Sequence, residues 1–235
     1  MPNKRNSART AKKTRILVVD DHPIVRQGLA QLIDEEPDLE VCAQAEDAPE
    51  AMSLIKKLEP DFVIVDISLK ETSGMELIKD IKVAYPNLPV LALSMHDESL
   101  YAERSLRAGA RGYVMKSEAT VKVVDAIRKI MSGRIYVSEN VAAKMMNKIV
   151  GAQPDVGASA IERLSDRELE VFSLIGQGYG TRKIAERLHL SVKTIETYRA
   201  HIKDKLNLTD ATELLQYAIR WSNIRPDQQQ RKTDV

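Results

Sequence analysis

Four short, largely apolar runs, each followed by a polar residue, shape the first half of this chain. The runs occupy residues 15–19, 62–65, 90–93 and 112–115, and they are followed by Asp20 and Asp21, Asp66, Ser94 and Lys116. Runs this short, separated by segments with helical patterns, are typical of buried parallel strands in an alternating βα chain. We therefore expect an α/β unit with right-handed crossovers and helices on both faces of a parallel sheet.

A further run of strand type at residues 39–44 brings the expected number of strands to five. The strands are expected at 15–20, 39–44, 61–66, 89–94 and 112–115, and the helices at about 23–35, 47–58, 74–84, 97–108 and 118–131. Pro23 suits a first helical turn, where its missing N–H costs little. Gly109 suits a left-handed cap after the fourth helix.

The polar residues at the strand ends predict a ligand site. The carboxyl ends of parallel strands share one edge of a sheet, and open α/β sheets bind ligands at that edge. The carboxylates of Asp20, Asp21 and Asp66 are therefore expected to converge there with the Ser94 hydroxyl and the Lys116 ammonium. Carboxylates so close together repel one another and need a cation, and hard oxygen ligands suit Mg²⁺.

Length and composition set further bounds on the chain. Its 235 residues are enough for one or two domains with a packed core. No run reaches the roughly 18 apolar residues that a membrane span needs, and the basic, polar segment 1–13 lacks the apolar stretch of a secretory signal. The single Cys42 cannot form an internal disulfide. We expect a cytoplasmic protein that has no membrane partner.

Charge and composition divide the chain into segments. Residues 1–15 carry six basic and no acidic side chains, residues 16–159 carry 16 basic and 23 acidic ones, and residues 160–235 carry 13 and 11. The expected segments are a disordered basic tail at 1–14, a first domain at 15–131, a linker with a helical segment at 132–160, a second domain at 161–225 and a tail at 226–235.

The second domain has no strand-like run. We expect four helices in it, at 166–176, 181–188, 192–206 and 210–221. Ser165 and Glu168 have the spacing of a capping box at the start of the first of these helices. Ser191 is placed to cap the third helix, on which Ile195, Ile202 and Leu206 are expected to share one buried face.

The first domain resembles the receiver domain of bacterial two-component systems, and the resemblance rests on Asp20, Asp21, Asp66, Ser94, Tyr113 and Lys116. It implies a flavodoxin-like (βα)5 fold with a parallel five-stranded sheet. It also implies that Asp66 accepts a phosphoryl group from a phosphohistidine of a partner kinase. Mg²⁺ would be held by Asp21 and Asp66, by Asp20 through water, and by the backbone carbonyl of Ser68. Lys116 would pair with the phosphoryl oxygens.

The same resemblance implies a switch. The Ser94 hydroxyl would bond a phosphoryl oxygen, and Tyr113 would rotate into the space that Ser94 vacates. It further implies a cis peptide bond at Lys116–Ser117, which costs a non-proline residue about 3 kcal/mol. Taken singly, each residue has another interpretation: Asp20 as a helix N-cap, Asp66 as a strand-end turn residue, Ser94 as a turn residue and Tyr113 as an ordinary core aromatic.

Residues 164–221 resemble a LuxR-type helix-turn-helix domain, with the match beginning at 164–172 and including the turn at 189–191. The resemblance implies that helix 192–206 enters the major groove of DNA. The candidate contacts are Thr181, Lys193, Glu196, Thr197, Tyr198, Arg199, Ala200, Lys203 and Lys205. In this family the last helix supports dimerisation on DNA, and here it carries Leu214, Leu215, Ala218, Ile219 and Trp221. A protein-binding helical bundle is the alternative.

Together the two domains resemble a NarL/FixJ-type response regulator over nearly the whole chain. This implies a transcription regulator and not an enzyme: a sensor histidine kinase phosphorylates Asp66, and the helical domain binds double-stranded promoter DNA as a homodimer. Two alternatives remain. One is a regulator that works without phosphorylation. The other is an aspartyl-phosphate phosphatase, which would usually need an acid-base carboxylate where this chain has Ser68.

Overall fold

The computed structural model describes residues 12–69, 73–95, 98–150 and 158–223, and it divides into two compact units, 1–146 and 147–235. The predictions for the tails at 1–14 and 226–235 fall almost wholly outside the described residues, as do those for the centre of the linker. Within the described part of the chain, no helix is both long and apolar enough to cross a membrane.

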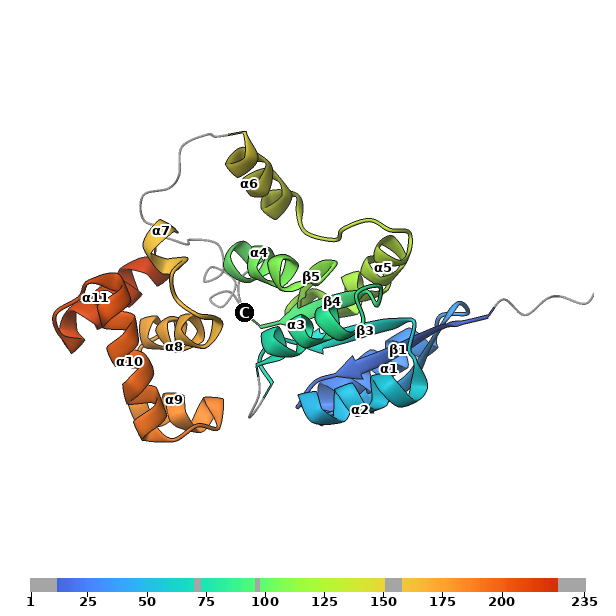
Figure 1. Cartoon of the computed structure of the whole chain (residues 1–235), viewed down its shortest axis with the longest axis horizontal. Helices are drawn as coiled ribbons and strands as arrows, with labels where there is room; N and C mark the ends of the chain where they lie inside the picture. The colour runs from blue at the N-terminus through green and yellow to red at the C-terminus, as the bar shows by residue number, and fades with distance from the viewer. Residues whose placement is uncertain (1–11, 70–72, 96–97, 151–157, 224–235) are drawn as a thin grey trace, which may run out of the picture. The chain divides into compact units, whose positions relative to one another are not determined.

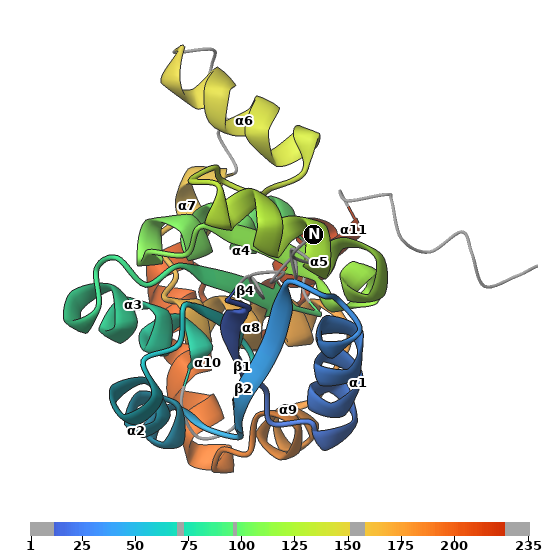
Figure 2. The same cartoon turned by 90° about the vertical axis from the view of Figure 1, so that its right-hand side faces the viewer.

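The first unit is built on a five-stranded parallel sheet with the strand order β2-β1-β3-β4-β5 (Figures 1 and 2). The strands are β1 (Thr14–Val19), β2 (Leu39–Ala45), β3 (Phe62–Asp66), β4 (Val90–Ser94) and β5 (Gly112–Met115). Every residue of β3 and β4 is buried, as expected for central strands covered on both faces.

Helices cover both faces of the sheet: α1 (Pro23–Asp34), α2 (Ala48–Leu58), α3 (Gly74–Ala84), α4 (Glu98–Ala108) and α5 (Ala119–Met131). On one face, α1 and α5 pack over Ile16, Phe62 and Leu91 in a single apolar core. The helices α2, α3 and α4 form the other layer (Figure 2). The central strands β3 and β4 therefore bury both sets of their alternating side chains, which explains their largely apolar sequences.

Two local features fix how the chain leaves the sheet. Pro23 lies in the first turn of α1, separated from the acidic residues after β1 only by the N-cap His22. Gly74 begins α3 against the end of β3, where a Cβ atom would lie 1.9 Å from the backbone oxygen of Asp66. Only glycine allows this approach, so Gly74 seats α3 directly beside Asp66.

The segment after α5 returns along the edge strand of the sheet. Tyr136 forms an isolated bridge to Gly112; the Tyr113 N–H donates to the Tyr136 carbonyl at 2.9 Å, and the Tyr136 N–H donates to the Arg111 carbonyl at 3.0 Å. Helix α6 (Glu139–Ile149) follows, and the Ser138 hydroxyl at its start donates to Glu98 of α4 at 2.6 Å. The linker is thus hydrogen-bonded to both β5 and α4.

The second unit is helical: α7 (Ala158–Ile161), α8 (Asp166–Gly176), α9 (Thr181–Leu188), α10 (Val192–Leu206) and α11 (Ala211–Asn223). Its core surrounds Phe172 of α8, whose ring packs against Tyr217 and Trp221 of α11 at centroid distances of 5.9 and 5.3 Å. A Cβ atom on Gly176 would lie 2.6 Å from the Ala218 backbone oxygen, so this glycine lets α8 and α11 approach closely.

The structure confirms the predicted fold class. Every strand and helix predicted within the described residues is present, with ends within two residues of those expected. The 3-10 turn η1 (Lys116–Glu118) and the short α7 were not predicted. The prediction of a cis Lys116–Ser117 bond is wrong, because the peptide is trans. Here the chain passes from β5 straight into η1, and the cost of a non-proline cis bond is avoided.

Candidate functional site

Three carboxylates are buried together where β1 and β3 end. Asp20 and Asp66 are each 1% exposed, and Asp21 is 7% exposed. Single ligand atoms from these three residues and from His22 all lie within 4.8 Å of one another. Burying charged carboxylates is costly unless a cation compensates them. The site therefore has the electrostatics of a cation site.

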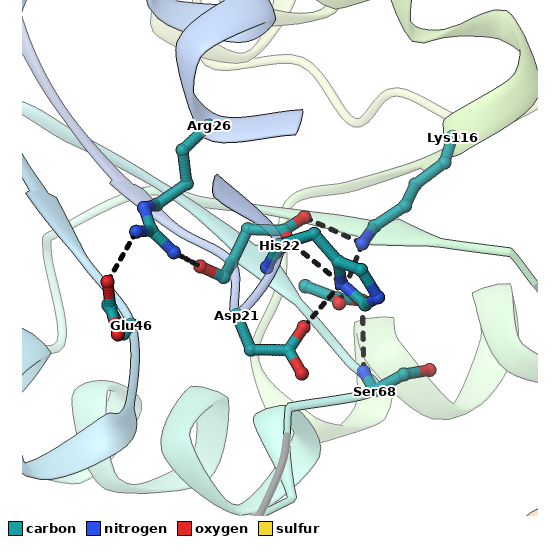
Figure 3. A network of polar contacts seen from close by, with 8 residues as sticks. Asp21, His22, Arg26, Glu46, Ser68 and Lys116 are labelled. Carbon is teal, nitrogen blue, oxygen red and sulfur yellow. Dashed lines mark hydrogen bonds and ion pairs between the residues drawn. The ribbon is translucent and has the colours of Figure 1, made fainter. Parts of the chain in front are cut away.

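Lys116 lies at the end of β5 and points into the acidic cluster (Figure 3). Its side chain is 8% exposed, and its Nζ atom lies 2.6 Å from Asp20 Oδ2 and 2.7 Å from Asp66 Oδ2. The ammonium therefore bridges two of the three carboxylates. It is also a mobile point charge that can pair with the oxygens of an incoming anion.

The pKa shifts reflect this burial. Burial raises the pKa of Asp66; the Lys116 ammonium opposes the rise and the Asp20 carboxylate adds to it, so the pKa stays above its ordinary value. Burial lowers the pKa of Lys116, but the carboxylates of Asp66 and Asp20 outweigh that effect and raise it. Lys116 is therefore held charged beside Asp66, whose ionisation is made costly by burial.

The donor set fits a magnesium ion. It consists of carboxylate oxygens, which are the hard ligands Mg²⁺ prefers. Ser68 lies next to it, and its N–H donates to Asp66 Oδ1 at 3.0 Å. Its hydroxyl oxygen is buried and has no hydrogen-bond partner within the described part of the chain. His22 Nδ1 lies 2.5 Å from Asp21 Oδ1, with an imidazole that is 61% exposed (Figure 3).

The two expected switch residues lie on neighbouring strands. Ser94 is the last residue of β4 and is fully buried, whereas Tyr113 lies within β5 and is 3% exposed. In the register of the two strands, Ala92 pairs with Tyr113 and Ser94 with Met115. Tyr113 also donates its backbone N–H to Tyr136 of the linker, so the strand that carries this aromatic residue is directly joined to the segment after α5.

Sequence reasoning missed one pair of residues at this edge, Arg26 and Glu46. The guanidinium of Arg26 is buried and reaches both the Asp20 carbonyl and the Glu46 carboxylate (Figure 3). A signal was present in the sequence, because Arg26 lies on the same helix face as the buried Leu29 and Ile33. An arginine in the apolar stripe of a helix needs a buried polar partner.

The DNA-contact candidates differ in exposure along α10. Lys193, Glu196, Thr197 and Ala200 are exposed, whereas Tyr198, Arg199 and Lys203 are half-buried, as is Thr181 at the start of α9. Burial lowers the pKa of Arg199. Ser191 caps α10 by accepting the Thr194 N–H at 3.0 Å, as predicted.

Lys205 has a partner inside the second unit. Its Nζ atom lies 2.6 Å from Glu168 Oε2, and the Glu168 side chain is only 5% exposed. The same carboxylate accepts the Ser165 N–H at 2.6 Å, which completes the predicted capping box of α8. Glu168 thus connects the start of α8 to the end of α10 through its ion pair with Lys205.

Comparison with known protein families agrees with both units. Residues 16–128 match the response regulator receiver domain, and residues 162–218 match the bacterial regulatory proteins of the luxR family. The chain belongs to the two-component response regulators that join a receiver domain to a LuxR-type helix-turn-helix domain. The resemblance inferred from the sequence is confirmed, and the protein is a DNA-binding transcription regulator of this family.

Among its relatives is the oxygen regulatory protein NreC. The Staphylococcus epidermidis protein is 36% identical over 211 residues, covering 88% of this chain and 97% of that protein. The Staphylococcus carnosus protein is 34% identical over 210 residues, with the same coverage. The match therefore includes both domains and the segment that joins them.

Solved structures resemble the chain as well. A LuxR-family response regulator from Aurantimonas sp. is 37% identical, with a TM-score of 0.55 over 59% of this chain and 99% of that one. The Salmonella typhimurium response regulator RcsB is 26% identical, with a TM-score of 0.62 over 89% of this chain and 98% of that one. RcsB bound to the promoter rprA in the presence of the phosphomimetic BeF3⁻ is also 26% identical. Its TM-score is 0.58, and the match covers 88% of this chain and 99% of that one.

Proposed function

We propose that Asp66 accepts a phosphoryl group from a sensor histidine kinase and that this modification controls the binding of promoter DNA by the helical domain, in the cytoplasm. The observation that carries the proposal is the buried set of Asp20, Asp21 and Asp66 around Lys116, in the same chain as a helix-turn-helix domain. A purely structural salt bridge would not need three carboxylates for one ammonium.

Asp66 is the nucleophile of this proposal. One of its carboxylate oxygens attacks phosphorus, the bond from phosphorus to the kinase histidine breaks, and an aspartyl phosphate forms. Asp21 and Asp66 would hold Mg²⁺ directly, Asp20 through water and Ser68 through its carbonyl. When bound, Mg²⁺ offsets the negative charge that gathers between carboxylates and phosphoryl oxygens. Lys116 then moves its pairing to those oxygens.

Ser94 and Tyr113 carry the change away from the site. The phosphoryl group adds about two negative charges and strong acceptors. We propose that the Ser94 hydroxyl bonds one of these oxygens and that Tyr113 rotates into the vacated space. The hydrogen bond from Tyr113 to Tyr136 and that from Ser138 to Glu98 support a path from this switch to the linker.

The exposed residues at the start of α10 read the DNA in this proposal. Glu196 accepts from a cytosine N4 group, Thr197 and Ala200 contact base edges, and Lys193 pairs with a phosphate. Thr181, Tyr198, Arg199 and Lys203 add contacts at the rim. Lys205, which was also a candidate, is assigned instead to the ion pair with Glu168.

The exposed apolar side of α11 supports a homodimer. Leu215 and Ile219 are 39% and 37% exposed and lie one helical turn apart, whereas Leu214 and Ala218 are buried in the unit's own core. RcsB has been solved as two dimers bound to two parallel DNAs. We propose that two copies of this chain meet through Leu215 and Ile219 when they bind DNA.

Phosphorylation with a small donor tests the proposal. Acetyl phosphate with Mg²⁺ should label the wild-type chain stably with one phosphoryl group, and Asp66→Asn should remain unlabelled. Chelation of Mg²⁺ should prevent labelling. Stable labelling of the Asp66→Asn chain would contradict the assignment, and rapid release of many equivalents of phosphate would favour a phosphatase.

A further inference from the structure

Arg26 occupies an unusual position on α1. The residue is 8% exposed and shares the buried face of the helix with Leu29 and Ile33. A guanidinium stays charged at every physiological pH, so its burial is costly unless its donors are satisfied. Its hydrogen-bond partners therefore show what this charge is used for.

Both ends of the guanidinium fork have a partner at the acidic edge of the sheet (Figure 3). Nη1 donates to the backbone carbonyl of Asp20 at 2.5 Å, and Nη2 donates to Glu46 Oε1 at 2.6 Å. Glu46 follows β2, and the Asp20 N–H donates to the Ala45 carbonyl at 3.1 Å. Arg26 therefore joins the loop after β1 to the loop after β2 through side-chain bonds that reinforce this backbone bond.

The bond to the Asp20 carbonyl acts on the carboxylate cluster. That carbonyl belongs to the peptide that links Asp20 to Asp21, so holding it restricts how both side chains are presented. Three carboxylates in a small volume repel one another and tend to push this loop away from β3. A fixed peptide removes that freedom before any ion arrives, and outer-shell groups of this kind normally tune metal affinity.

We propose that Arg26 is a positioning residue for the magnesium ion: it fixes the Asp20–Asp21 peptide in the conformation that binds the cation, and Glu46 anchors Arg26 in turn. This inference rests on the proposed function, because it assumes that the carboxylates hold Mg²⁺. A lysine cannot replace this arginine, because a single ammonium lacks the planar fork that reaches two partners.

The test is calorimetric titration of Mg²⁺ into the full-length, unphosphorylated chain. Arg26→Lys and Arg26→Met should each weaken Mg²⁺ binding by about tenfold, the lower end for outer-shell changes at metal sites. Glu46→Gln should weaken it less. In labelling with acetyl phosphate, the Mg²⁺ concentration for half-maximal rate should rise by the same factor, while the final extent at saturating Mg²⁺ stays that of wild type.

Arg128 provides the matched control. It also extends from a helix to acids in a loop, with Nε 3.0 Å from Asp38 Oδ2 and Nη2 2.6 Å from Glu36 Oε2. Those acids precede β2 and lie at the opposite edge of the sheet from the carboxylate cluster. Arg128→Met should leave Mg²⁺ affinity unchanged.

The outcomes separate the two claims. Wild-type Mg²⁺ affinity in Arg26→Met and Glu46→Gln overturns the positioning role while leaving the proposed function intact. An equal loss in Arg128→Met also overturns it, because the effect would then be a general consequence of lost stability. If circular dichroism shows that Arg26→Met does not fold, the Mg²⁺ affinity of Glu46→Gln decides whether Arg26 has the positioning role. A wild-type chain that binds no Mg²⁺ overturns both claims.

Discussion

At the scale of single residues, position at a strand end carries most of the information about the site. Asp20, Asp66 and Lys116 are far apart in sequence, yet parallel strands bring their ends to one edge, and the structure places Lys116 within hydrogen-bond distance of both carboxylates. Arg26 was missed because a charged residue is ordinarily expected at the surface, although its spacing from Leu29 and Ile33 places it on the buried face of α1. The cis bond at Lys116–Ser117 was expected from the family resemblance alone, because no property of these two residues favours it.

A residue-scale prediction concerns α10. Lys193→Ala should weaken binding to all duplexes and reduce the slope of log affinity against log salt by about one, because one phosphate contact is lost. Glu196→Gln should cost about 1–3 kcal/mol on the preferred duplex and little on random DNA. Fluorescence anisotropy over a range of salt concentrations measures both effects. Lys56→Ala, on the exposed side of α2, is the control, and an unchanged salt slope for Lys193→Ala would count against a phosphate contact.

At the scale of elements, helices and strands followed from periodicity and caps, whereas the contacts between them did not. The bridge from Tyr136 to β5 involves one residue on the linker side, too few to show an alternating pattern. The pairing of Glu168 with Lys205 joins the first turn of α8 to the last turn of α10. Nothing local in the sequence distinguishes Lys205 from the solvent-facing lysines of the same helix.

The edge of the sheet gives an element-scale prediction. Gly112→Ala would place a Cβ atom 2.8 Å from Ile130 Cδ1 and 2.9 Å from the Tyr136 carbonyl oxygen, and Tyr136→Pro would remove the N–H that donates to Arg111. Each change should destabilise the first unit by about 1–3 kcal/mol in thermal unfolding followed by circular dichroism. Gly28→Ala on α1 has open space around it and should stabilise the chain by up to about 1 kcal/mol. Equal effects from all three substitutions would show that the contact between Tyr136 and β5 does not stabilise the first unit.

The connection between α8 and α10 predicts a dependence on pH. Burial raises the pKa of Glu168, but the hydrogen bonds from Lys205 and Ser165 outweigh it, so the folded-state pKa lies below the ordinary value. The stability that Glu168 contributes is therefore present above the ordinary carboxyl pKa and is lost as pH falls through the lower folded-state value.

Urea unfolding followed by the fluorescence of Trp221, the only tryptophan of the chain, measures this contribution. At pH 7, Glu168→Gln should lower the free energy of unfolding by about 1–2 kcal/mol. As the pH is lowered to about 3, the difference between wild type and variant should shrink. A difference that stays constant over this range would show that the Glu168 charge does not stabilise the second unit.

At the scale of the whole molecule, the sequence predicted two units because the periodicity changes from alternating strand and helix to helix alone. The acidic excess lies in residues 16–159 with the carboxylate cluster, and a slight basic excess lies in residues 160–235 with the helix-turn-helix domain. In the proposed function, phosphorylation of Asp66 couples the two units through β5 and the linker.

Binding of DNA with and without a phosphoryl mimic tests this joint claim most directly. A duplex is first selected from a random pool by the full-length chain in Mg²⁺ and beryllofluoride, and its Kd is then measured with and without beryllofluoride. We expect beryllofluoride to lower the Kd of the wild-type chain by about tenfold, within the usual range of allosteric coupling, and to leave the Kd of Asp66→Asn unchanged. Equal affinity in all four measurements would contradict it, and the helical domain would then act without phosphorylation.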